Sequence, residues 1–462
     1  MGWARLPHRR TGISSLPESS HTVKKPSGCR ARSFRGGCGA CAPWPPTATS
    51  GTLLSRGLRS GTARIKESTI MHYHSVTQDT VRITASSFCR NRVSELHLMA
   101  VSDNQKAFSG QMEDILGAVT EYLSAHGIPN SSVVFTRFFL SDYANQAEEL
   151  SFIVDYVTSV FGDCAVSIVQ QPPAASGKIA VWAYVIDDGN RGCLSKFRAT
   201  PACDLVVTRG GYEHIWSTQL VSGNCSTKSF DQAGAVFTKL SHSLEGKGYS
   251  LKENCVRTWL FVKDIDSNYS GVVDARRRFF ETVNMTWDTH YIASTGIEGR
   301  HADPGVCVLL DAYSIGGVQH GQIGFLKAPD FLNPTHEYGV TFERGTSVAF
   351  GDRKHIFISG TASINHKGEI MHRNDVVRQL NRTFVNIMAL LADAGAGMEN
   401  VAQMIVYLRD PSDSETVNAY LDENYRNIPN IVTLAPVCRP GWLVEVECIA
   451  ISDAANPSFA NF

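Results

Sequence analysis

The stretch "IFISGTASINHKGEI", from Ile356 to Ile370, is the part of the sequence that most clearly indicates the fold. Its apolar start predicts a buried strand, and Ser359, Gly360 and Thr361 predict a small-residue turn at the strand's end. A glycine there lets a ligand approach the backbone, and the hydroxyl and amide groups beside it can donate hydrogen bonds. We therefore expect this turn to position a small molecule, although it contains no pair of nucleophile and base.

The residues that follow complete a unit of helix, strand, helix, strand, loop and strand. The same order of elements occurs twice upstream, so the chain contains three copies, which span residues 107–186, 229–315 and 375–452. Asp142, Asp264 and Asp410 each end the first strand of these runs, at spacings of 122 and 146 residues. The longer spacing predicts an insertion between the second and third copies.

A unit with both helices on one face of its sheet is an α+β layer, and the opposite face must be covered by something else. We predict that the three copies cover one another as an internal pseudo-trimeric barrel, with clefts where adjacent units meet. The predicted organisation is a disordered leader at 1–70, unit one at 85–190, unit two at 205–316, an inserted connector at 317–342 and unit three at 343–455.

Composition places the chain among ordinary globular proteins. It has 462 residues, 43% of them hydrophobic, and a net charge of −1. No apolar run approaches the roughly 18 residues that a membrane span needs, so we expect no membrane association and a cytoplasmic location. The twelve cysteines are scattered singly, which favours reduced thiols over a disulfide framework.

The first 70 residues differ from the rest because they contain twelve Lys or Arg but only Glu18 and Glu67 as acids, and they show no periodicity. Two explanations stay open: an organellar transit peptide, or translation assigned upstream of a true start at Met71, which we favour. Cys38 and Cys41 form a possible redox or zinc pair, but no second pair with zinc spacing follows. We predict no metal and no cofactor.

The third unit resembles the Rid (YjgF) family, in "IFISGTASINHKGEI", in the strand and helix of 402–425 and in the closing hairpin of 429–451. The resemblance implies chorismate-mutase-like α/β units and ligand sites between them, as in homotrimeric Rid proteins. Units two and three also resemble chorismatases, because "ASTGIEG" (293–299), "LNPTHEYGVTFERG" (332–345) and "ISGTAS" (358–363) follow in the chorismatase order. That branch hydrolyses chorismate.

One departure from the Rid pattern concerns the arginine with which active imine deaminases clamp a substrate carboxylate. Ile431 stands at that position here. The family's carboxylate in the last strand matches Glu445, and alternation places Glu447 on the same face. We predict Glu445 and Glu447 as catalytic acids; the alternative is that they are structural glutamates at an interface between units.

The chorismatase resemblance also implies ligand contacts for Arg344, Tyr338, Thr295 and Gly296, and Arg439 is a further candidate anchor. Ser359, Gly360 and Thr361 complete the predicted substrate-binding set. An exposed arginine that binds nothing is the commoner alternative for each cation. We read the basic cluster of residues 274–280 as a solvated helix face, not as a nucleic-acid site.

Two functions are compatible with this pattern. The first is a hydrolase acting on a small anionic enol ether or imine, and the second is a non-catalytic ligand-binding or regulatory protein that has lost the deaminase arginine. Both imply a small anionic metabolite as partner and neither a nucleic acid nor a membrane; a monomer and a homo-oligomer are both compatible. The first requires that Glu445, Tyr338 and Arg344 converge on one cleft between units two and three.

Overall fold

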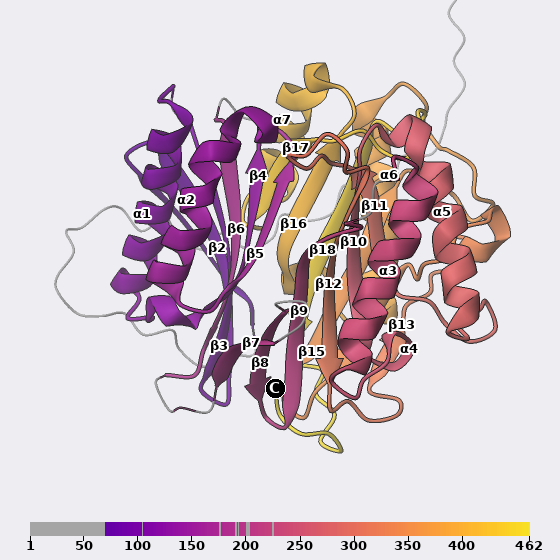
Figure 1. Ribbon diagram of the computed structural model, residues 1–462, viewed down its shortest axis with the longest axis horizontal. Coiled ribbons are helices and arrows are strands. Elements are labelled where there is room, and N and C mark those ends of the chain that lie inside the picture. The colour runs from indigo at the N-terminus through magenta and orange to yellow at the C-terminus, as the bar shows by residue number, and fades with distance from the viewer. Residues whose placement is uncertain are drawn as a thin grey trace, which may run out of the picture. The chain divides into compact units, whose positions relative to one another are not determined.

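The computed structural model describes residues 70–462 except 104, 175–176, 190–191, 193, 200–203 and 224–225. The predicted leader up to residue 69, with Cys38 and Cys41, lies outside the described residues. Within the described ranges the chain forms three sheets of six strands each, with helices beside each sheet (Figure 1). No helix of the described part is both long and apolar enough to cross a membrane.

Each sheet belongs to one unit. Unit one contains β1 (His72–Gln78), β2 (Val81–Arg90), β3 (Val93–Ser102), α1 (Phe108–Ala125), η1 (Asn130–Ser132), β4 (Val133–Leu140), α2 (Tyr143–Phe161), β5 (Ala165–Gln170) and β6 (Ile179–Asp187). Unit two contains β7 (Ser195–Ala199), β8 (Asp204–Arg209), β9 (Tyr212–Val221), α3 (Ser229–Glu245), α4 (Leu251–Asn254), β10 (Cys255–Val262), α5 (Ile265–Thr282), β11 (Ala293–Glu298) and β12 (Val308–Gly316).

Unit three contains β13 (Ile323–Phe325), η2 (Thr335–Tyr338), β14 (Gly345–Ala349), β15 (Lys354–Ala362), α6 (Val376–Asp393), η3 (Met398–Asn400), β16 (Val401–Leu408), η4 (Pro411–Asp413), α7 (Ser414–Asn424), β17 (Asn430–Leu434) and β18 (Val444–Ser452). The predicted order of elements is therefore confirmed in all three copies.

The three sheets have one topology. Their strand orders are β1-β2-β3-β6-β4-β5, β7-β8-β9-β12-β10-β11 and β13-β14-β15-β18-β16-β17. In each, the last two strands of the order run parallel and are connected through a helix, as parallel pairing requires. Asp142, Asp264 and Asp410 occupy the N-cap position of the helix that follows β4, β10 and β16. The side chains of Asp142 and Asp410 accept a backbone N–H of that helix, as N-cap residues do, whereas Asp264 makes no such bond.

The sheets extend beyond the unit bounds expected from the sequence. β1 begins before residue 85, β7 lies between the expected units one and two, and β13 lies inside the expected connector. All three are edge strands paired on one side only. Because β1 and β7 are mostly exposed and β13 is short, none carries the apolar alternation that identifies a buried strand.

The sheet faces that point away from the units' own helices contribute to one shared core. It includes Trp182 from unit one, Trp216 and Trp259 from unit two, and Phe357 and Tyr407 from unit three. The helices α1 and α2 pack against the sheet of their own unit in a separate hydrophobic cluster. Isolated β-bridges also join each pair of units: 170 with 300 for units one and two, 173 with 433 for units one and three, and both 293 with 343 and 297 with 437 for units two and three. These bridges do not extend into ladders, so strand pairing in the described residues closes no barrel, and the pseudo-trimeric barrel stays a prediction.

Candidate active site between units two and three

A pocket with an empty volume of about 530 Å³, including its mouth, lies at the junction of units two and three. Unit three contributes β15, β18, the segment before β14 and the turn before β18, and unit two contributes α5 and β11. The lining residues are Tyr269, Arg276, Ser294, Gly296, Val340, Phe342, Arg344, Gly360, Ala362, Ile364, Cys438, Arg439, Trp442 and Glu445. Five of the ten residues predicted from the sequence are among them: Glu445, Arg344, Arg439, Gly360 and Gly296.

Glu445 is the carboxyl group of this pocket. It lies on β18 opposite Tyr407 and is 5% exposed, and no described residue makes a hydrogen bond to its side chain. Burial raises the pKa of Glu445 to about 8, and the nearby Glu447 charge adds to the rise, whereas Arg257 and Arg344 oppose it. At neutral pH the Glu445 side chain is therefore mostly a protonated acid that faces the pocket.

Gly360 provides the space in which this carboxyl lies. A Cβ at position 360 would lie 2.0 Å from Oε1 of Glu445 and 3.1 Å from Cγ2 of Thr295. The Gly360 N–H donates to the Thr295 hydroxyl across the junction, at 2.9 Å. The small residue in the Ser-Gly-Thr turn is thus required by close packing between a strand of unit two and the acid of unit three.

We expect Gly360→Ala to displace the Glu445 carboxyl and to lower the free energy of unfolding by about 1–3 kcal/mol, the usual cost of overpacking. Urea denaturation measures the second effect. Gly117→Ala in α1 is the matched control, since nothing lies within 4 Å of the Cβ it would add, and alanine is favoured over glycine in a helix. Equal effects of the two substitutions would contradict the packing described here.

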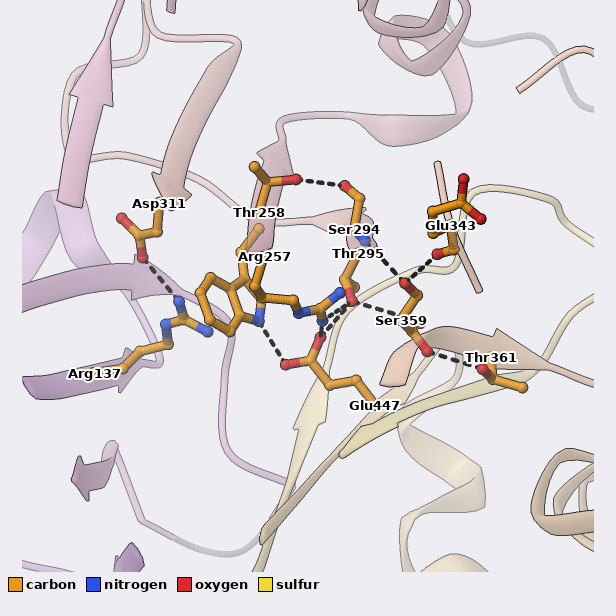
Figure 2. A network of polar contacts seen from close by, with 12 residues as sticks. Arg137, Arg257, Thr258, Ser294, Thr295, Asp311, Glu343, Ser359, Thr361 and Glu447 are labelled. Atoms are coloured by element: carbon orange, nitrogen blue, oxygen red, sulfur yellow. Dashed lines mark hydrogen bonds and ion pairs between the residues drawn. The ribbon is translucent and has the colours of Figure 1, made fainter. Parts of the chain in front are cut away.

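Glu447, predicted as a second catalytic acid, has a different environment. Its carboxylate accepts hydrogen bonds from Arg257 Nη2 and Trp259 Nε1, both at 2.7 Å, and from the Thr295 hydroxyl at 2.5 Å. Figure 2 shows Arg257, Thr295 and Glu447 of this network next to Ser359. The side chain is buried, does not line the pocket and is fully engaged, so the structure favours the structural alternative for Glu447.

The same arrangement occurs between units one and two. Arg137 donates to Asp311 at 2.9 Å (Figure 2), and the Ser167 hydroxyl donates to the same oxygen at 2.5 Å. Asp311 and Glu447 are equivalent by strand register, as are Ser167 and Thr295. A carboxylate, a hydroxyl and an arginine thus join adjacent units twice, which is what a structural connection predicts and a single catalytic site does not.

The hydroxyl groups of the turn are likewise engaged. Ser359 Oγ donates to the Glu343 carbonyl at 2.6 Å and accepts from Ser294 N at 2.9 Å, and Thr361 Oγ1 donates to the Ser359 carbonyl at 2.8 Å. Neither residue lines the pocket. These hydroxyls fix the turn against unit two, and Thr295 does the same through Gly360; ligand contact by Ser359, Thr361 and Thr295 stays a prediction.

Three arginines surround the pocket. Arg344 is 8% exposed and is positioned by Asn333, whose carbonyl accepts from Nη2 at 3.0 Å. Arg439 lies 5.1 Å from the Trp442 ring, and Arg276 donates from Nε to the Thr341 hydroxyl at 3.1 Å. Three arginine side chains at one pocket favour an anionic ligand.

Arg276 corrects the reading of residues 274–280 as a solvated face, because it is only 2% exposed. Arg277 and Arg278 on the same helix are exposed, as expected. Helical spacing from the buried Val272 and Phe280 could have identified Arg276, since it lies four residues from each. The run of three arginines concealed that difference.

Tyr269 is a second pocket residue that the sequence did not suggest. It comes from α5 of unit two, contacts the position that a Cβ of Gly296 would occupy, and is hydrogen-bonded to the Cys438 thiol. Burial raises the pKa of Cys438 to about 12, so this thiol is neutral and is a poor nucleophile. No sequence motif marks Tyr269; packing against Gly296 places it.

The convergence that the hydrolase hypothesis requires is found for two of its three residues. Glu445 and Arg344 line one pocket between units two and three. Tyr338 belongs to η2, but its side chain lies outside the part that the structure describes. Within the described ranges, no group of three or more His, Cys, Asp or Glu residues is arranged to hold a metal ion.

Comparison with known proteins agrees with this architecture. Residues 346–452 match the family model described as Endoribonuclease L-PSP. A RutC family protein of Synechocystis is 35% identical over 86 residues, which cover 18% of this chain and 65% of that protein. A RutC family protein of Pyrococcus abyssi is 32% identical over 101 residues, which cover 21% of this chain and 79% of that protein.

Among solved structures, a chorismatase crystal structure superimposes with a TM-score of 0.54, at 16% identity, over 69% of this chain and 93% of that chain. At this identity the similarity concerns the fold alone. The fold therefore defines a chorismatase-like α+β protein. Through its third unit the chain belongs to the Rid (endoribonuclease L-PSP) family.

Proposed function

We propose that the protein is a chorismatase-like hydrolase that acts on a small anionic enol ether or imine in the pocket between units two and three. The observation that carries this proposal is Glu445, a buried acid with its pKa raised to about 8 beside three arginines. An acid that stays protonated at neutral pH can donate a proton to such a substrate. The arginines would hold the carboxylates of the substrate.

In this mechanism Glu445 donates a proton to the substrate and later accepts one from water. Proton transfer from the Glu445 carboxyl to an enol ether makes the ether carbon electrophilic, and water adds to it. Collapse of the adduct breaks the carbon–oxygen bond and releases a 2-oxo acid and an alcohol, and the proton lost from the added water returns to the carboxylate. For an imine, the same steps release a carbonyl compound and ammonia.

The test uses the full chain with chorismate and, separately, with an amino-acid-derived imine. Pyruvate release from the first or ammonia release from the second supports the hydrolase. Silence on both substrates would contradict it and would favour the second candidate, a non-catalytic ligand-binding protein. The specific observation behind that candidate is Ile431, a buried apolar residue where the deaminase clamp needs an arginine.

The pH dependence of the rate tests the role of Glu445. Because the protonated form is the active acid and its pKa is about 8, we expect the rate to be constant below pH 8. Above it the rate should fall about tenfold per pH unit, as for loss of a single proton. Steady-state rates across the neutral and alkaline range measure this, and a rate that rises with pH through 8 would exclude Glu445 as the acid.

Replacing Arg344 tests anion binding. We expect Arg344→Gln to raise KM about 10- to 100-fold, the loss of a hydrogen bond between charged groups, with a smaller effect on kcat. Arg277→Gln is the control, since Arg277 is exposed and pairs with Asp274 on α5. If both variants bind alike, Arg344 does not anchor the substrate; calorimetric binding provides the same comparison for a non-catalytic protein.

The remaining expectations belong to this proposal. We propose that the three units form a pseudo-trimeric barrel, supported by the isolated β-bridges at each junction, and that the chain acts alone or in a larger assembly. We propose a small anionic metabolite as its partner, with no nucleic acid or membrane. The free cysteines of the described residues, Cys89 and Cys164 among them, agree with the proposed cytoplasmic location.

A further inference from the structure

A second cavity lies inside the shared core, away from the Glu445 pocket. This inner cavity has an empty volume of about 280 Å³ and receives residues from all three units: Glu95, His97 and Tyr184 from unit one, Trp216 and Tyr313 from unit two, and His355 from unit three. Every one of these six residues is at most 6% exposed. No step of the proposed reaction uses any of them.

Two N–H donors of the inner cavity have no acceptor among the described residues. Trp216 Nε1 is buried and makes no hydrogen bond. His97 Nδ1 lies 3.2 Å from Trp182 Nε1, and because an indole N–H can only donate, Nδ1 of His97 must be the acceptor. The His97 proton is therefore on Nε2, which is the second donor, and burial lowers the pKa of His97 to about 3, so the ring is neutral.

The charged groups of the cavity are already paired with one another. Arg353 Nη1 lies 2.7 Å from Glu95 Oε1, and His355 Nε2 lies 2.9 Å from the same oxygen. Tyr184 donates to the other oxygen of Glu95. An added anion would meet the Glu95 carboxylate, and an added cation would meet the two N–H donors, so the occupant must be a neutral acceptor.

We propose that the inner cavity binds ordered water, which accepts hydrogen bonds from Trp216 Nε1 and His97 Nε2 and so links unit one to unit two. A buried N–H without an acceptor costs about 1–3 kcal/mol, and a buried water with several polar partners removes that cost. Only about 20 Å³ of this space is wide enough to hold the centre of a water molecule, which is room for about one or two waters and no larger ligand.

High-resolution diffraction from crystals of the full chain tests this proposal. We expect a water peak within hydrogen-bonding distance of both Trp216 Nε1 and His97 Nε2. An empty cavity that takes up xenon under pressure would overturn the proposal, because xenon binds dry apolar space. A bromide peak after soaking would also overturn it, since it would identify an anion site.

A variant with a matched control adds a second measurement. We expect Trp216→Phe crystals to lose the water peak or to show it moved toward His97, whereas Trp287→Phe should leave it unchanged, because Trp287 is 69% exposed. An unchanged peak in Trp216→Phe would contradict the assignment of the indole as its donor. If Trp216→Phe does not fold, the diffraction, xenon and bromide results on the unmodified chain decide the proposal.

Discussion

Glu445→Gln is expected to remove most of the turnover while leaving the fold intact. General acid catalysis contributes about 10²- to 10⁴-fold to a rate, so the variant should lose activity by that factor. The amide has the shape of the protonated acid but cannot release a proton at neutral pH. Pyruvate or ammonia release measures the loss, and Glu423→Gln on the exposed face of α7 is the control.

The same variant should not be destabilised at neutral pH. The pKa of Glu445 is about 8 in the folded protein, against an ordinary value of 4.5 for a glutamate carboxyl. Between these values the folded state holds a proton that the unfolded state has lost, so the contribution of Glu445 to stability is present below pH 4.5 and is lost as pH rises through 8. Denaturation curves should therefore show wild type losing stability relative to Glu445→Gln over that window.

Glu95→Gln is expected to cause the largest loss of stability. Glu95 and Arg353 form an ion pair at 2.7 Å, and both side chains are 0% exposed. Removing the Glu95 charge leaves a buried guanidinium with Asp352 as its remaining acidic partner, and breaking such a pair costs about 3–5 kcal/mol. Urea denaturation measures this, and because Glu95 joins unit one to unit three, the loss would show that unit one supports the folded whole.

The control for that experiment is an exposed ion pair. Asp274 and Arg277 are 55% and 46% exposed, so Asp274→Asn should cost about 0–1 kcal/mol. A cost for Glu95→Gln as small as that of Asp274→Asn would show that the buried pair contributes little. Loss of catalysis in Glu95→Gln without loss of stability would also contradict the structural role assigned to Glu95.

The repeated order of elements could be predicted because it depends on local properties. Apolar residues recur at helix or strand spacing in 107–186, 229–315 and 375–452, and Asp142, Asp264 and Asp410 end corresponding strands. The edge strands β1, β7 and β13 could not be found in this way. Each is an edge strand that pairs with a neighbour on one side only. Because little of such a strand is buried, its sequence lacks the apolar alternation of a buried strand.

The candidate site was predicted in part for a related reason. Glu445, Arg344 and Gly360 lie in segments that resemble known families, and the structure places all three at one pocket. Arg276 and Tyr269 come from a helix of unit two that meets this pocket only after the units pack. Glu447 looked equivalent to Glu445 because alternation along a strand shows which face of the sheet a side chain is on. Alternation does not show which residues that side chain contacts.

The sequence by itself determined the three-unit order and the family of the third unit, because both depend on the local pattern of residues along the chain. Only the tertiary structure decided which carboxyl stays free. Glu447 accepts hydrogen bonds from Arg257, Trp259 and Thr295 of unit two. Glu445, two residues away, lies in the space left by the absent side chain of Gly360. These partners are distant in sequence, and packing of the units decides which carboxyl is hydrogen-bonded and which one faces the pocket.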